Sequence, residues 1–171
     1  RVLFRSGAFP DSHPLHLGMP GMHGMYSAVT AMQQSDLLIT LGARFDDRVT
    51  GKLDGFAPNA KIIHVDIDSA EFNKIRRADV AIRGQIDEAL TAINAKVTTV
   101  GDYAEWWRQI KGWQEKHPLA YDPQEENSAL RPQAIIEAIG TRSAPGTIVT
   151  SGVGQHQMWA AQHWKYEEPG T

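Results

Sequence analysis

Three absences narrow the function of this chain of 171 residues. It has no cysteine, which excludes disulfide-stapled secreted domains, thiol catalysis and cysteine-based zinc or iron–sulfur sites within it. No apolar run approaches the roughly 18 residues of a membrane span. Lys and Arg number 17 against 20 Asp and Glu, so the net charge is −3 and provides no bulk positive field for nucleic acid. These absences predict a protein with neither nucleic-acid nor membrane partners.

The composition is otherwise that of a globular protein, with 42% hydrophobic and 22% charged residues. Short β-branched segments predict strands, and they alternate with segments whose apolar residues recur at helical spacing. This alternation predicts an α/β fold with a partial doubly wound parallel sheet. The predicted strands are 36–42, 61–68 and 78–84. The predicted helices are 25–35, 69–77 with Ser69 as N-cap, and a third that begins at 86. We expect the segment 43–60 to be a loop or short helix.

A change in composition at 118–131 predicts a linker to the start of a second α/β domain. A Trp-rich helix over 102–117 precedes it, and a helix with Pro132 in its first turn follows it. A strand over 147–152 and a further helix complete the prediction. We therefore divide the chain into 1–100, 101–131 and 132–171. Because it opens without Met and stops just after an apolar segment, we expect it to be a piece of a larger protein.

A glycine-rich segment, GMPGMHG (18–24), stands immediately before the first predicted helix. Glycine permits positive φ and close approach of a ligand to the backbone, and a helix start offers free N–H groups to a diphosphate. A flexible entry loop is the alternative, because the spacing is not that of the dinucleotide fingerprint. His23 could hydrogen-bond a ligand or merely cap the helix. His13, His16 and His23 lie in a loop rich in Pro and Gly, and we predict no metal site there.

Charged residues follow the first two predicted strands, at the ends where ligands bind in open α/β sheets. LGARFDDR (41–48) carries two arginines that could clamp a phosphate or carboxylate, although a solvated ion-pair loop is equally compatible. Asp66 in VDID (65–68) could accept hydrogen bonds from ribose hydroxyls. Its alternative role, as a helix N-cap, suits Asp68 or Ser69 better.

A second glycine-spaced turn, SGVGQHQMWAA (151–161), leads from the last predicted strand into the last predicted helix. Gln155 and His156 would place amide and imidazole donors beside the N–H groups of the helix start, which suits a diphosphate. The alternative is a polar cap on a helix whose Met158, Trp159 and Ala160 simply pack.

These motifs, in this order, resemble the large catalytic subunit of acetohydroxyacid synthase (acetolactate synthase) over about residues 7 to 169. RFDDRVTGK and GQHQMWAAQ carry most of the resemblance, whereas the opening RVLFRS does not match the family. The resemblance implies a thiamine-diphosphate carboligase that joins two pyruvates, or pyruvate with 2-oxobutyrate, with loss of carbon dioxide, in branched-chain amino-acid synthesis. The chain would be the latter part of its central FAD-binding domain plus the start of its diphosphate-binding domain.

The resemblance also implies roles for individual residues. Asp47 and Arg48 would lie beside the substrate access channel, with Arg48 orienting the incoming oxo acid. Val153, Gly154, Gln155 and His156 would hold thiamine diphosphate. The FAD-binding residues would be Met22, His23, Gly24, Gly42, Ala43, Arg44, Asp66, Ile67, Gln85 and Ile86.

One position departs from the family, which usually has Asp where this sequence has the neutral Gln85, so the contact with FAD would be weakened or rearranged. The catalytic glutamate and the Mg²⁺ ligands of the family would lie outside the chain, so it holds no predicted catalytic or metal-binding residue. We expect the isolated chain to be inactive and marginally folded, because half a parallel sheet exposes apolar surface.

The resemblance further implies a homo-oligomer, dimer or tetramer, with a small regulatory subunit, located in the bacterial cytoplasm or, in a plant, the plastid. Two other functions stay open: another thiamine-diphosphate flavoenzyme such as pyruvate oxidase or glyoxylate carboligase, and a non-catalytic nucleotide-binding module.

Overall fold

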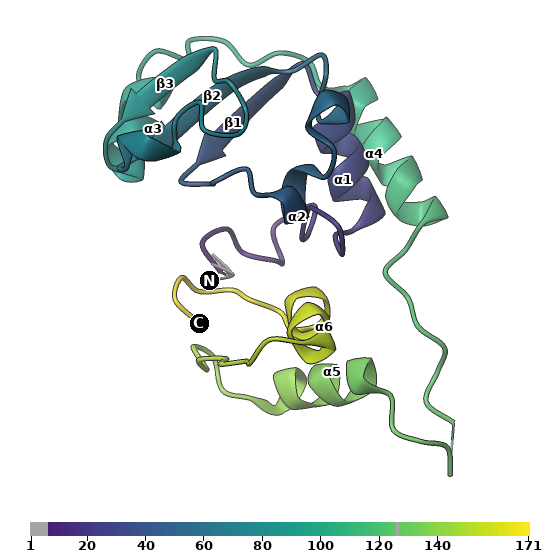
Figure 1. The fold of residues 1–171 in the computed structure, drawn as a ribbon. Coiled ribbons are helices and arrows are strands. Elements are labelled where there is room, and N and C mark those ends of the chain that lie inside the picture. The colour runs from purple at the N-terminus through teal and green to yellow at the C-terminus, as the bar shows by residue number, and fades with distance from the viewer. Residues whose placement is uncertain (1–6, 126) are drawn as a thin grey trace. The chain divides into compact units, whose positions relative to one another are not determined.

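The computed structural model describes residues 7–125 and 127–171. The opening segment, 1–6, lies outside the described residues. The chain forms two compact units (Figure 1). One, which we call the sheet unit, comprises 20–22 and 26–117; the other, the helical unit, comprises the described residues up to 19, together with 23–25 and 118–171.

The sheet unit is built on three parallel strands in the order β1, β2, β3. β1 spans Leu37–Leu41, β2 Lys61–Asp66 and β3 Val80–Arg83. Ile39 pairs with Ile63 across the first ladder, and Val65 with Ile82 across the second. All three predicted strands and the predicted parallel α/β sheet are thereby confirmed.

Helices of the sheet unit follow the predicted periodicity, except in one segment. α1 (Tyr26–Gln34) packs against α4 (Ala104–Lys116), which buries Ile110 (Figure 1). α3 spans Ile86–Asn94, and the segment 43–60 contains the short helix α2 (Asp47–Thr50) and a 3-10 turn, Leu53–Gly55.

The helix predicted over 69–77 was wrong: only a 3-10 turn, Ser69–Glu71, forms there. Its N-cap is Asp68, whose Oδ1 accepts a hydrogen bond from the Ala70 N–H (2.9 Å), so Ser69 is not the cap. Asn73 adopts a left-handed φ of 58° and its side chain accepts a hydrogen bond from the Ala78 N–H. The helix cannot continue through this residue, because left-handed backbone breaks the right-handed hydrogen-bond ladder.

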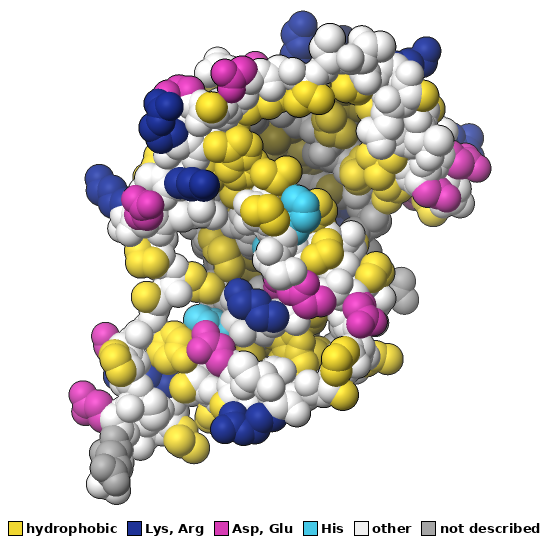
Figure 2. Space-filling model, turned by 180° about the vertical axis from the view of Figure 1, so that it is seen from behind, with side chains coloured by type: hydrophobic (Ala, Val, Ile, Leu, Met, Phe, Trp, Pro, Cys, Tyr) yellow, Lys and Arg dark blue, Asp and Glu magenta, His cyan; other side chains and the backbone are white. Residues whose placement is uncertain are grey.

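A hydrophobic cluster beside β2 forms the core of the sheet unit, and it comprises Phe45, Phe56, Ala57, Ala60 and Ile62. Other apolar side chains of this unit stay at the surface: Leu37 and Ile39 of β1 are each 46% exposed. Figure 2 shows hydrophobic side chains exposed at the surface among polar and charged ones.

The helical unit consists of α5 (Pro132–Arg142) packed against α6 (Gln155–His163), with both helices where they were predicted. Pro132 opens α5 as expected, since its missing N–H is not needed in the first turn. An N-terminal loop contacts the segment that follows α6. The Asp11 N–H donates to the Tyr166 carbonyl (2.9 Å), and Ser12 Oγ donates to Glu167 Oε2 (2.6 Å).

The strand predicted over 147–152 was wrong, since that segment has no regular structure. A strand needs a neighbour to satisfy its backbone groups, and the described part of the helical unit contains no other strand. Ile148 is 70% exposed as a result. The predicted linker, 118–131, contains no helix or strand in its described residues. No helix within the described ranges has the length and apolarity needed to cross a bilayer.

Candidate functional site

The carboxyl ends of the three strands lie together at one edge of the sheet. The Gly42 N–H donates to the Val65 carbonyl (2.7 Å), and the Gly84 N–H donates to the Asp66 carbonyl (3.1 Å). The turns that follow β1, β2 and β3 are therefore neighbours. The structure brings together at this carboxyl edge seven predicted residues: Gly42, Ala43, Arg44, Asp66, Ile67, Gln85 and Ile86.

The turn after β1 holds its arginines close to carboxylates without burying them. Asp46 caps α2 by accepting a hydrogen bond from the Arg48 N–H (3.2 Å). The Arg44–Asp46 and Arg48–Asp47 ion pairs are both 3.8 Å long, and the Arg48 side chain is 73% exposed. Ion pairs this long and exposed contribute little to folding stability, so the guanidinium groups are positioned at the surface rather than used in the core.

Asp66 is the most buried polar residue of the carboxyl edge, with 8% of its surface exposed. Its Oδ1 accepts a hydrogen bond from the Asp68 N–H (2.9 Å). Asp68, not Asp66, caps the turn that follows. A buried carboxylate at the end of a central strand is suited to accept hydrogen bonds from hydroxyl groups of a ligand.

Gln85 is the N-cap of α3, and its exposed side chain makes no capping hydrogen bond. The first turn of this helix contains Asp87 and Glu88, whose negative charges interact favourably with the positive end of the helix dipole. The segment 85–86 therefore reaches the carboxyl edge with an uncapped helix start.

The glycine loop 18–24 uses positive φ at two glycines, Gly18 (87°) and Gly21 (93°). Within the sheet unit, the Met22 N–H donates to the Arg48 carbonyl (2.7 Å), so this part of the loop packs on α2. A Cβ on Gly21 would lie 2.5 Å from that carbonyl oxygen. Glycine is required here both by its φ and by the close approach of the two backbones.

His23 and Gly24 belong to the helical unit. The His23 carbonyl accepts a hydrogen bond from Gln162 Nε2 of α6 (2.7 Å), while the His23 side chain is exposed. The residues predicted to bind FAD are thus divided between the two units.

At the start of α6, His156 folds back over the glycines that precede the helix. A Cβ on Gly154, the N-cap, would lie 2.9 Å from the ring carbon Cε1, and one on Gly152 would lie 3.4 Å from Nε2. A side chain at Gly154 would displace the ring, whereas one at Gly152 would make an ordinary van der Waals contact with it. Gln155 and His156 are exposed, and Val153 is 93% exposed, so this turn is open to a ligand.

Two features were not predicted from the sequence. His64, in the middle of β2, is fully buried. In the helical unit, Glu137 Oε2 accepts a hydrogen bond from Tyr121 Oη (2.7 Å). The other oxygen, Oε1, is hydrogen-bonded to His163 Nδ1 (2.9 Å). These contacts, the Tyr121 bond first, lower the pKa of Glu137, and the same bond raises the pKa of Tyr121. The alternation in KIIHVDID, which turns every second residue inward, was the available signal for His64.

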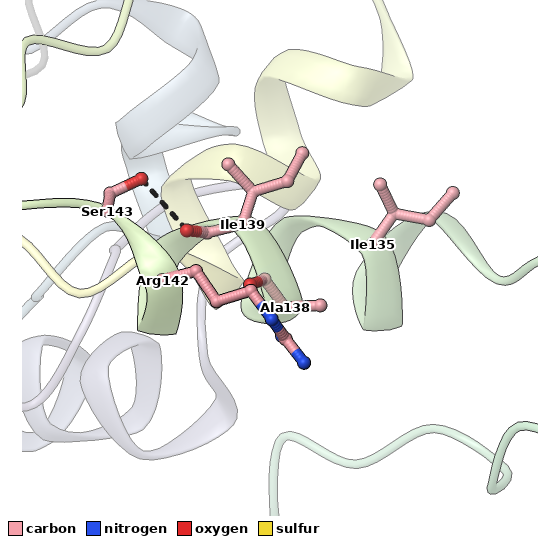
Figure 3. A pocket seen from close by; sticks show the side chains of 5 residues that line it. All are labelled: Ile135, Ala138, Ile139, Arg142 and Ser143. Atoms are coloured by element: carbon pink, nitrogen blue, oxygen red, sulfur yellow. Dashed lines mark hydrogen bonds between the residues drawn. The ribbon is translucent and has the colours of Figure 1, made fainter.

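A shallow pocket of about 490 Å³ lies on α5, lined by Ile135, Ala138, Ile139, Arg142 and Ser143 (Figure 3). Ser143 Oγ donates to the Ile139 carbonyl (2.8 Å) rather than pointing a free hydroxyl into it. None of the predicted site residues lines this pocket, and we assign it no chemistry. No cluster of His, Asp or Glu suited to a metal ion occurs within the described ranges.

Residues 2–93 match the family model for the central domain of thiamine pyrophosphate enzymes. The chain belongs to this family. Because the match begins at residue 2, the expectation that the opening RVLFRS does not match the family was wrong. It is 52% identical to the acetolactate synthase of Mycobacterium bovis and to the acetolactate synthase large subunit of Mycobacterium tuberculosis, and each alignment covers 98% of this chain. It is 50% identical to the acetolactate synthase large subunit of Corynebacterium glutamicum over 99% of the chain.

The chain spans 28% of the length of each of these three relatives. The resemblance to acetolactate synthase large subunits that the motifs predicted is confirmed, and membership of the family agrees with the parallel α/β sheet.

Proposed function

We propose that this chain forms part of the catalytic subunit of an acetolactate synthase. The complete protein would join two pyruvates, or pyruvate with 2-oxobutyrate, to a 2-acetohydroxy acid and one carbon dioxide. The observation that carries the proposal is the 52% identity to acetolactate synthases over nearly the whole chain. When bound, thiamine diphosphate supplies the carbanion-stabilising chemistry that such a carboligation needs.

The carboxyl edge of the sheet unit fits the nucleotide part of FAD. Its buried Asp66 carboxylate would accept hydrogen bonds from ribose hydroxyls, and Arg44 would supply a cationic donor to phosphate. Gly42, with φ 59°, and the uncapped start of α3 at Gln85 leave backbone close to a ligand. Ala43, Ile67 and Ile86, with Met22, His23 and Gly24, complete the proposed FAD-binding set.

The turn before α6 fits a diphosphate for the same physical reason. Gly154 has no Cβ, and the N–H groups at the start of α6 are those that a helix leaves unsatisfied. Val153, Gly154, Gln155 and His156 would hold the phosphates of thiamine diphosphate. The Mg²⁺ that accompanies the cofactor would be bound by residues other than these.

Arg48 would orient the incoming oxo acid, with Asp47 at 3.8 Å restricting its guanidinium group. The exposure of both side chains supports a role at an access channel rather than in the core. The partners would be a second copy of the catalytic subunit and a regulatory small subunit.

The test is an assay of the complete catalytic subunit containing this chain for acetolactate formation from pyruvate. Product that forms only with both thiamine diphosphate and Mg²⁺ supports the proposal. Preference for glyoxylate, or consumption of pyruvate by oxidation without carboligation, would assign the protein to glyoxylate carboligases or pyruvate oxidases instead. No turnover, with FAD bound, would leave a nucleotide-binding module.

A further inference from the structure

His64 is a buried polar side chain for which the proposed function gives no role. It is fully buried in β2, and its ring is nearly perpendicular to those of two phenylalanines. The ring centroids are 5.3 Å from Phe45, at an interplanar angle of 89°, and 5.1 Å from Phe72, at 87°. Neither ring nitrogen has a hydrogen-bond partner among the residues that the structure describes. A buried polar group left in this state requires an explanation, because burial removes its water.

The polar group in front of this ring is the Asp66 carboxylate. His64 and Asp66 are two residues apart in one strand, so their side chains lie on the same face of the sheet. His64 Nε2 is 3.9 Å from Asp66 Oδ2, which is just beyond hydrogen-bond distance. The other carboxylate oxygen, Oδ1, already accepts a hydrogen bond from the Asp68 N–H. A small rotation of the carboxylate would close the gap to Nε2.

The two aromatic neighbours hold the ring in a fixed direction. Phe45 comes from the turn after β1, and Phe72 from the connection between β2 and β3. Phe45 is itself 5% exposed and has a positive φ of 52°, so its position is set by the packing around it. The imidazole is therefore held by contacts with both rings, and its Nε2 lies 3.9 Å from the Asp66 carboxylate at the carboxyl end of the strand.

We propose that His64 is a positioning residue that orients the Asp66 carboxylate, through an Nε2–H hydrogen bond to Oδ2, for binding the ribose diol of a nucleotide. This inference rests on the proposed FAD site. His64 does not touch the ligand and acts through Asp66, in the way that buried partners fix the direction of metal-binding or catalytic side chains. The neutral imidazole with its proton on Nε2 is the tautomer required.

Three substitutions separate the hydrogen bond from the packing. In His64→Gln the amide nitrogen reaches about as far as Nε2 and keeps an N–H donor. His64→Asn keeps the same amide but is one methylene shorter, and His64→Phe fills the space without a donor. FAD affinity is measured by titration of the complete catalytic subunit, with the thermal unfolding midpoint as a separate readout of packing.

We expect His64→Asn and His64→Phe to bind FAD about fivefold more weakly, the effect of losing one ordinary hydrogen bond, and His64→Gln to stay near wild type. In an Asp66→Asn background, His64→Phe should have no further effect on FAD affinity, because the carboxylate that His64 orients has been removed. If His64→Phe does not fold, the comparison of the two amide variants still decides the question.

The inference is overturned if His64→Phe or His64→Asn binds FAD like the wild type, or if His64→Gln is as weak as His64→Asn. Equal losses in both Asp66 backgrounds would also overturn it, since His64 would then act independently of the carboxylate. A wild-type protein that fails to bind FAD overturns the proposed site itself, and this result is distinguishable because it appears before any substitution is made.

Discussion

Replacing Gly21 by alanine tests whether the glycine loop must pack on α2. At φ 93°, an L-residue costs about 1–2 kcal/mol. The new Cβ would lie 2.5 Å from the Arg48 carbonyl oxygen and 3.1 Å from Val49 Cα, so the loop would have to move away. That movement breaks the hydrogen bond from the Met22 N–H to the same carbonyl, which contributes about 1 kcal/mol. The sum is a destabilisation of about 2–3 kcal/mol.

Two other glycines of the sheet unit separate these contributions. Gly51 has φ 59° with nothing within 4 Å of its Cβ position, so Gly51→Ala should cost only the backbone strain. Gly112 lies inside α4 with open space around it, so Gly112→Ala should stabilise the protein by about 0.5–1 kcal/mol. All three substitutions restrict the unfolded chain alike, so their comparison cancels that effect.

The assay is urea unfolding of the complete catalytic subunit, in which the order of the midpoints is compared. We predict Gly112→Ala highest, then wild type, then Gly51→Ala, with Gly21→Ala lowest. Exchange of the Met22 amide hydrogen with solvent should also become faster in Gly21→Ala. A Gly21→Ala midpoint equal to or above that of Gly51→Ala would refute the close packing of the loop on Arg48.

Three further outcomes follow from particular side chains. Arg48→Ala should slow the use of the second oxo acid in steady-state assays. FAD should be retained, because the 3.8 Å ion pair of Arg48 with Asp47 is exposed and contributes little to the fold; loss of flavin alone would refute this role. Gln85→Asp should raise the unfolding free energy by about 1 kcal/mol by capping α3; an unchanged urea midpoint would contradict this. The lowered pKa of Glu137 means that its carboxylate stabilises the fold fully above its ordinary pKa of 4.5, and that this contribution is lost as pH falls through the folded pKa. Glu137→Gln should therefore flatten the acid side of the stability profile, and a profile like that of the wild type would count against the network.

The strands could be predicted from the sequence because short β-branched runs such as KIIHVD favour strands over other secondary structure. Their parallel order, and with it the meeting of Gly42 and Asp66 at one edge, was predicted from helical segments expected between the strands. The structure keeps the parallel order, although only α2 and two 3-10 turns form in those connections. Helix α5 could likewise be predicted, from Pro132 in its first turn and from the helical spacing of its isoleucines.

Other features depend on contacts that no local pattern encodes. The segment 69–77 has helical spacing, but the left-handed backbone of Asn73 ends the turn early. The segment 147–152 has strand composition, but a strand forms only against a neighbour. The contacts of His64 with Phe45 and Phe72 join residues from different connections of the sheet, so the alternation of β2 indicated its burial but not its neighbours.

The most direct test of the central claim compares the two ends of one strand. Asp66 lies at the carboxyl end of β2 and Lys61, which is exposed, at the amino end. In FAD titrations of the complete subunit, Asp66→Asn should weaken binding about tenfold or more, as expected for a hydrogen bond to a charged group, while Lys61→Gln should bind like the wild type. Equal affinities in the two variants would contradict the assignment of the nucleotide to the carboxyl edge of the sheet.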